Sequence, residues 1–230
     1  AVPELLPVLP LRETVPLPDT LTPLAVGQER SVRLVNDVLA GDRLLCMVAS
    51  KNPELDAPGP EDLHEVGVVG GIARMLKVPD GTLRVLVQGA QRVRIVEWVR
   101  ETPYLVARVE ELPDEVHADS PELDALVRNV QSTFSQIVEE VPYLPEELQL
   151  AVTNVDEPST LSHLIAGSLR LKTEERQELL EEVDVSRRLR RLAEVLAREL
   201  EVISIGSKIQ SQVQSEIDRN QREFVLRQQL

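Results

Sequence analysis

The sequence predicts an α+β fold: an N-terminal β-rich domain with one short helix, then a helical bundle and a very long C-terminal helix. Two patterns predict it. Between residues 43 and 112, β-rich apolar runs are separated by turn residues, which is typical of a small antiparallel, barrel-like sheet. After about residue 120, apolar residues recur every third or fourth position, as they do on helices. We therefore expect three parts, formed by residues 1–115, 116–185 and 186–230.

The first 41 residues predict an extended segment and a short helix. Four prolines interrupt residues 5–18, and because proline has no N–H to donate, we expect an edge strand or an extended arm. Residues 27–41 then place apolar side chains at helical spacing and end at Gly41, a residue type that commonly follows helices. The apolar positions of this helix are Val32, Val35, Val38 and Leu39.

A β-hairpin is the clearest signal in the next part of the chain. Residues 65–78 and 83–90 are β-rich and flank the sequence Pro-Asp-Gly-Thr, a strong turn signal. The glycine cluster in the first of these runs lacks the lysine and Ser/Thr of a phosphate-binding loop, so we expect a β-bulge there. The other predicted strands are residues 43–50, 91–100 and 104–112.

Helix signals dominate after residue 120. Ser120 is a good N-cap, Pro121 suits the first helical position, and an apolar stripe follows as far as Val138. Two shorter helices are predicted at residues 145–155 and 158–169. These helices would form a small bundle.

The last helical signals begin at Thr173 and Asp184, which we expect to act as N-caps. The segment after Asp184 would be roughly 67 Å long as a helix, more than a domain of this size can cover. Two apolar seams follow it out of phase, and Gly206 lies at their join, so we expect a slip in register there. No stop signal ends the helix, so we expect it to continue into another domain. The seams are Leu189, Leu192, Leu196, Leu200 and Ile203, then Ile205, Ile209, Val213 and Ile217.

Composition and charge exclude some classes of protein. Of 230 residues 42% are apolar but only 2% aromatic, which predicts an aliphatic core. The one cysteine, Cys46, lies in an apolar run, so we expect a buried thiol and a reducing compartment. Residues 101–186 carry 20 acidic and 5 basic residues, which disfavours nucleic acid as a partner. We find no signal peptide and no membrane-spanning stretch in the sequence.

Catalytic and metal-binding patterns are not visible in the sequence. The three histidines, His64, His117 and His163, have no metal-ligand spacing, and we interpret them as surface or helix-edge residues. We therefore expect this chain to be no enzyme and to hold no metal or cofactor.

Three stretches together resemble the amino-terminal region of the Lon proteases. Residues 6–32, "LPVLPLRETVPLPDTLTPLAVGQERSV", resemble the start of that family. Residues 61–95, "EDLHEVGVVGGIARMLKVPDGTLRVLVQGAQRVRI", resemble its central hairpin. Residues 175–213, followed by "NQREFVLRQQL", resemble the long helix that leads into its ATPase domain.

The resemblance implies a role without chemistry in this chain. In the family this region is associated with substrate selection and with holding a hexamer together. An ATPase domain using ATP and Mg, and a protease domain with a Ser–Lys dyad, would follow it. The chain has no P-loop sequence and no candidate dyad, so the family's catalytic residues have no counterparts here. A bacterial cytoplasm is expected rather than the mitochondrial matrix, because no Arg- and Ser-rich transit segment precedes the domain.

Two sets of apolar residues are candidates for binding. The arm and the hairpin are expected to contact unfolded or damaged protein substrates, with Met75 favoured because flexible thioethers suit promiscuous surfaces. The distal helix is expected to mediate self-association. The substrate candidates are Pro16, Leu17, Pro18, Leu21, Met75, Leu76 and Val78, and the oligomerisation candidates are Ile209, Val213, Ile217, Phe224 and Leu226.

Two other functions fit parts of the sequence. A stand-alone PUA-like or LON-type binding module would have a defined pocket, but the few aromatic residues are too scattered to build one. A coiled-coil oligomerisation protein would self-associate tightly, but the interruption at Gly206 counts against strong coiling.

Overall fold

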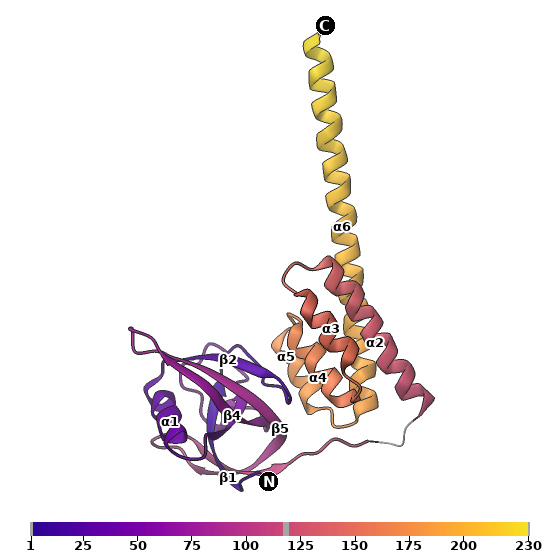
Figure 1. The fold of residues 1–230 in the computed structure, drawn as a ribbon. Coiled ribbons are helices and arrows are strands. Elements are labelled where there is room, and N and C mark those ends of the chain that lie inside the picture. The colour runs from indigo at the N-terminus through magenta and orange to yellow at the C-terminus, as the bar shows by residue number, and fades with distance from the viewer. Residues whose placement is uncertain (1, 117–119, 230) are drawn as a thin grey trace. The chain divides into compact units, whose positions relative to one another are not determined.

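The computed structural model describes residues 2–116 and 120–229, which form two compact units (Figure 1). The first unit comprises residues 2–116 with 155–189, and the second comprises residues 120–154 with 190–229. This grouping differs from the three parts expected from the sequence. The physical reason is that helices after residue 155 bond to the sheet, as where the Gln177 side-chain amide donates to the Val66 carbonyl oxygen at 3.2 Å.

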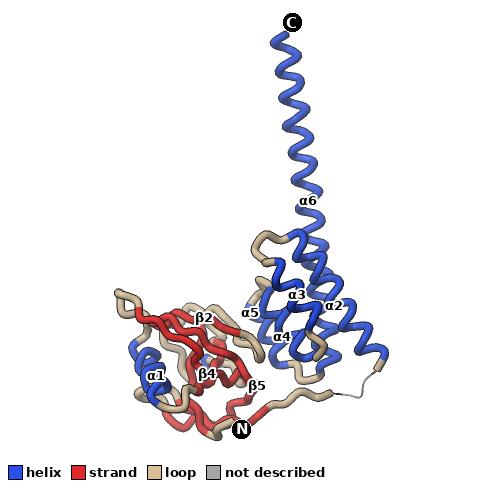
Figure 2. Tube along the Cα trace, viewed as in Figure 1, coloured by secondary structure: helices blue, strands red, loops and turns tan. Residues whose placement is uncertain are grey.

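The first unit contains a six-stranded sheet, of which all strands but β2 close into a barrel (Figure 2). The strands lie in the order β2-β5-β4-β3-β1-β6, and β6 also pairs with β5, which closes the sheet. Neighbouring strands are antiparallel except β1 and β3, which are parallel. The α+β class and the barrel-like sheet expected from the sequence are confirmed. The strands are β1 (Leu5–Leu11), β2 (Leu21–Val26), β3 (Leu44–Ala49), β4 (Val66–Lys77), β5 (Leu83–Arg100) and β6 (Val106–Glu111).

Strand β1 lies inside the barrel wall, so the expectation of an edge strand is wrong for its residues. Val8 donates its N–H to the Leu105 carbonyl oxygen at 2.8 Å, so the even-numbered amides face β6. Pro10 lies past the end of the pairing with β6, and Pro7 faces β3 before that pairing begins. Neither proline removes a donor that a neighbouring strand would need, so both are tolerated.

Strand β5 is one strand of 18 residues where the sequence predicts two. It stays paired with β4 through Gly89, and the arm between β1 and β2 lies directly against that residue. A Cβ at residue 89 would overlap the Leu17 carbonyl oxygen, and the Gly89 N–H donates to the Thr20 carbonyl oxygen at 2.8 Å. The glycine therefore marks a close contact between backbones rather than a turn. The predicted bulge in β4 is confirmed, with register shifts after Val69 and Ile72.

An aliphatic core fills the barrel. It includes Leu6, Val48, Val93 and Cys46, which is fully buried as expected from the sequence. Burial raises the pKa of the Cys46 thiol to about 12, so the thiol stays protonated. Helix α1 (Glu29–Ala40) also belongs to this unit, and its buried residues are Leu34, Val35 and Val38.

Five further helices follow the barrel, at the places where the sequence predicts them. Ser120 caps the first of them, since its hydroxyl oxygen accepts from the Leu123 N–H at 3.1 Å. Asp184 caps the last, accepting from the Arg187 N–H at 3.1 Å. Thr173 is not a cap, because Lys172 holds that position. The helices are α2 (Pro121–Glu140), α3 (Glu146–Asn154), α4 (Pro158–Ser168), α5 (Thr173–Glu181) and α6 (Val185–Gln229), and Pro60–Asp62 form a short 3-10 helix.

The second unit consists of α2, α3 and most of α6. Phe134 and Ile137 of α2 and Leu192 and Leu196 of α6 are buried. Helix α6 runs without interruption through Gly206, although the apolar seams change phase there. Beyond Ile203 its described residues are all exposed. The helix is therefore anchored only in its first part.

Candidate functional site

The hairpin formed by β4 and β5 holds three of the predicted substrate contacts. Leu76 is 64% exposed, while Met75 and the turn residue Val78 are half-buried. Leu76 pairs with Arg84 and Met75 pairs with Val85. Since side chains alternate along a strand, Leu76 points to the outer face of the sheet and Met75 to its inner face.

The four predicted arm residues are divided by their exposure. Pro16, Leu17 and Pro18 are buried in the first unit, whereas Leu21, the first residue of β2, is 54% exposed. The buried three are therefore part of the packing between the arm and β5. Only Leu21 presents a large apolar surface to solvent.

Leu21 and Leu76 share one side of the sheet, here called the outer face. Leu21 pairs with Gln88 of β5, and Leu76 pairs with Arg84 of the same strand. Gln88 and Arg84 are four residues apart, which is about 14 Å along β5. Sequence reasoning missed the residues between them because it did not predict β2. The alternation of exposed and buried residues along Leu21–Val26 was the available signal. The outer face consists of Leu21, Pro23, Ala25, Arg74, Leu76, Arg84, Leu86 and Gln88.

A groove lies beside α4 within the first unit, here called the α4 groove. Its volume is about 460 Å³. Gly167 of α4 approaches the arm closely, and a Cβ there would lie 3.3 Å from Thr20 Cγ2. The predicted residues Leu17 and Leu21 both line the groove, Leu17 as a buried wall and Leu21 at the surface. The other lining residues are Thr14, Val15, Asp19, Thr20, Thr22, Pro23, Gln88, Leu164, Gly167, Ser168 and Arg176.

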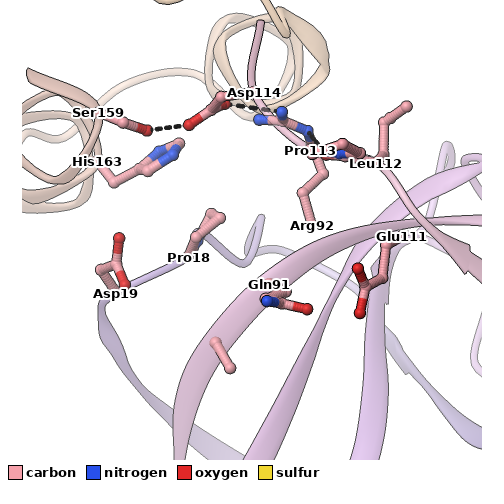
Figure 3. Close-up of a pocket in the computed structure, with 11 residues that line it drawn as sticks. Pro18, Asp19, Gln91, Arg92, Glu111, Leu112, Pro113, Asp114, Ser159 and His163 are labelled. Carbon is pink, nitrogen blue, oxygen red and sulfur yellow. Dashed lines mark hydrogen bonds and ion pairs between the residues drawn. The ribbon is translucent and has the colours of Figure 1, made fainter. Parts of the chain in front are cut away.

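An ionic cluster centred on Asp114 joins four segments of the first unit, and Figure 3 shows Asp114 with Ser159 and Arg92. One carboxylate oxygen of Asp114 accepts from Arg92 Nη2 at 2.8 Å and from Arg188 Nη2 at 2.6 Å, and the other accepts from the Ser159 hydroxyl. The side chains of Arg92 and Arg188 are only 3% and 1% exposed. The cluster ties β5, the segment after β6, α4 and the first turn of α6 together.

Electrostatics favour the ionised form of Asp114. Burial alone would raise the pKa of this carboxyl, but the hydrogen bonds from Arg188 and Ser159 outweigh it and lower the pKa to about 2. Sequence reasoning missed this cluster. Its signal was Arg188, which lies one turn before the buried Leu192 on the same side of α6.

His163 corrects the interpretation of the histidines as surface or helix-edge residues, because it is 2% exposed. Its Nε2 lies 3.3 Å from Arg188 Nη1. Burial, and then the charge of Arg188, lower the pKa of His163 to about 3, so the ring is neutral. His64 is half-buried, and His117 lies outside the described residues.

The cluster contains the residue types of a hydrolase triad but not its geometry. Ser159 donates to Asp114 and accepts from Arg188 Nη1 at 3.0 Å, and His163 faces a guanidinium in place of a serine. A histidine with so low a pKa is a poor general base. The cavity of about 230 Å³ beside it therefore lacks an activated nucleophile. The contacts of this arrangement link segments that lie far apart in the chain.

The oligomerisation candidates all lie on the exposed part of α6. At 3.6 residues per turn, Ile209, Val213, Ile217 and Phe224 fall on one stripe, together with Ile205. Leu226 points to another side of the helix. The structure therefore brings four of the five candidates together. These four residues and Ile205 are here called the α6 stripe.

Within residues 2–116 and 120–229, no three His, Cys, Asp or Glu side chains are grouped as metal ligands. In the same residues, none of the helices combines the length and apolarity that crossing a membrane requires.

A barrel with exposed apolar side chains, joined to helices, has the character of a binding domain. The family described as the ATP-dependent protease La (LON) substrate-binding domain matches residues 5–198, and the chain belongs to this family. The Lon protease of Dictyoglomus thermophilum is 44% identical over 229 residues, and that of Koribacter versatilis is 42% identical over 226 residues. These matches cover 100% and 98% of the chain but only 29% and 28% of the relatives' lengths.

Two solved structures share the fold. The N-terminal domain of the Mycobacterium avium complex Lon protease aligns with a TM-score of 0.68 and 22% identity, covering 84% of this chain and 98% of that one. The Lon N-terminal domain protein from Xanthomonas campestris aligns with a TM-score of 0.58 and 24% identity, covering 82% and 96%. The chain is thus a Lon N-terminal region, which confirms the resemblance seen in the sequence.

Proposed function

We propose that this chain is the non-catalytic region with which an ATP-dependent Lon protease recognises unfolded or damaged proteins. The observation that supports this best is the outer face, where Leu21 and Leu76 stay exposed although the barrel has an ample core. Native proteins bury most large apolar segments, so an exposed apolar face selects chains that have lost their fold.

The chemistry of the outer face suits variable clients. Leu86 and Pro23 lie between Leu21 and Leu76, and the aliphatic stems of Arg74 and Arg84 extend the apolar surface while their charges stay in water. Met75 at the neighbouring half-buried position can adapt its shape. Pro16, Leu17 and Pro18 would support this face from beneath rather than contact clients.

The same proposal includes assembly through α6. The α6 stripe is apolar and exposed along several helical turns, and a second helix of the same kind could cover it. In the whole protein this contact would support a hexamer. The whole protein would also carry an ATPase domain that uses ATP and Mg, and a Ser–Lys protease domain, in a bacterial cytoplasm.

NMR titration with one client protein, once folded and once destabilised so that it unfolds, tests the recognition role. We expect only the unfolded form to shift peaks, and the shifts to map to the outer face around Leu21 and Leu76, without ATP. Shifts of equal size with the folded form, or none with either form, would contradict the proposal.

A further inference from the structure

The α4 groove contains a guanidinium whose charge the chain does not balance. Arg176 of α5 lines the groove, and its Nη2 donates to the carbonyl oxygen of Leu169, the residue that ends α4, at 2.7 Å. Its Nε is buried and has no hydrogen-bond partner. No carboxylate among the described residues forms an ion pair with it.

This arrangement differs from the other buried arginines of the unit. Arg92 and Arg188 share the carboxylate of Asp114, which compensates their loss of hydration. Arg176 loses hydration without such compensation, and burial lowers its pKa as a result. A guanidinium still keeps its proton at neutral pH, so its positive charge stays available to an anion in the groove.

The other residues that line the groove indicate what kind of molecule would carry the anion. Its walls include Val15, Leu17 and Leu164, which suit apolar side chains. Its one carboxylate is Asp19, which lies near the start of α4 and accepts from Thr160 Oγ1 at 3.4 Å. Leu169, where Arg176 is bound, lies nine residues further along the chain, or about 13 Å along the axis of α4.

We propose that the α4 groove binds the C-terminal carboxylate of an extended apolar polypeptide segment, with the guanidinium of Arg176 as the donor. The inference rests on the proposed function and adds which part of the client the groove binds. Charge complementarity selects a carboxylate, and the apolar walls select its neighbours. Acidic side chains interrupt apolar segments, whereas a C-terminal carboxylate can follow an uninterrupted one.

Fluorescence anisotropy of labelled ten-residue apolar peptides with the 230-residue chain tests this. One peptide ends in a free carboxylate, the second ends in an amide, and the third is an amide with an internal aspartate. We expect the free acid to bind about tenfold to a hundredfold more tightly than the amide, as charge-assisted hydrogen bonds allow. An aspartate peptide that binds as tightly as the free acid would overturn the assignment to a chain end.

Variants of Arg176 test whether its guanidinium is the donor to the peptide carboxylate. Arg176→Gln is expected to remove the preference for the free acid, and a circular dichroism spectrum like that of the wild type checks that the variant is folded. Arg176→Lys keeps the charge without the planar fork and should retain a reduced preference. Arg33→Gln removes an exposed guanidinium from α1 and should retain all of it.

The outcomes separate the two proposals. If the amide and the acid bind equally well to the wild-type chain, or if Arg176→Gln keeps the preference, the carboxylate inference is wrong while client binding stands. If neither peptide binds and no unfolded client shifts NMR peaks, the proposed function itself fails.

Discussion

Arg92 of β5 and Arg188 of α6 donate to the same carboxylate oxygen of Asp114, at 2.8 Å and 2.6 Å. Two guanidiniums that would otherwise repel each other are thereby held together inside the first unit. Through this carboxylate the start of α6 is linked to β5.

Asp114→Asn is expected to destabilise the chain by about 3 kcal/mol, because it leaves two buried guanidiniums without a counter-charge. Denaturant unfolding followed by circular dichroism measures the change in free energy. Glu216→Gln, which removes an exposed carboxylate from α6, is the matched control and should change it by less than about 0.5 kcal/mol. Equal effects of both variants would show that the cluster contributes little.

His163 predicts a loss of stability in mild acid. Because the pKa of His163 is about 3 in the folded chain against 6.5 for the free side chain, only the unfolded chain takes up a proton between these values. The free energy of unfolding therefore falls as pH drops below 6.5, by at most roughly 1.4 kcal/mol per pH unit from this residue. Urea unfolding at several pH values from 7 to 4.5 stays above the range in which Asp114 titrates.

His163→Gln should flatten that pH dependence. His64→Gln is the control. Burial also lowers the pKa of His64, but this residue is only half-buried, so its replacement should flatten the pH dependence less. An unchanged slope in the His163 variant would mean that the ring is protonated in the folded chain.

Leu76→Ser is expected to weaken binding of an unfolded client roughly fivefold or more, if the outer face carries recognition. Its effect on the free energy of unfolding should stay within about 0.5 kcal/mol, since the side chain is exposed. Anisotropy with a labelled, destabilised client gives the affinity. Val99→Ser, at an exposed apolar position in the other half of β5, should bind like the wild type.

Ile209→Ser with Val213→Ser is expected to weaken self-association roughly tenfold, because the two changes remove the centre of the α6 stripe. Sedimentation velocity over a range of concentrations measures the effect. Val225→Ser changes an exposed residue outside the α6 stripe and should leave association unaltered. If the double variant associates as the wild type does, another surface joins the copies.

The sequence predicted those parts of the fold that depend on local signals. The hairpin turn, the caps at Ser120 and Asp184 and the burial of Cys46 are set by neighbouring residues, and the structure confirms them. The place of β1 within the barrel could not be predicted in this way. Its prolines are tolerated only because of where two distant strands stop pairing.

The candidate site also combines features that local patterns predict with features that depend on distant contacts. Leu21 and Leu76 were predicted as single apolar residues, but their shared face depends on the register of β2 and β4 against β5. The burial of Leu17 and the isolation of Arg176 depend on how α4 and α5 lie against the arm. Such relationships arise from contacts between residues far apart in the chain, which no local pattern encodes.

The inaccessible thiol of Cys46 has a practical consequence. Since the only sulfhydryl is buried and stays protonated, maleimide reagents should not react with the native chain. A cysteine introduced at an exposed position such as Ser211 would then carry a dye or spin label alone, with no background substitution needed. Distances between labels on the helix and the barrel could thus be followed in an otherwise unaltered protein.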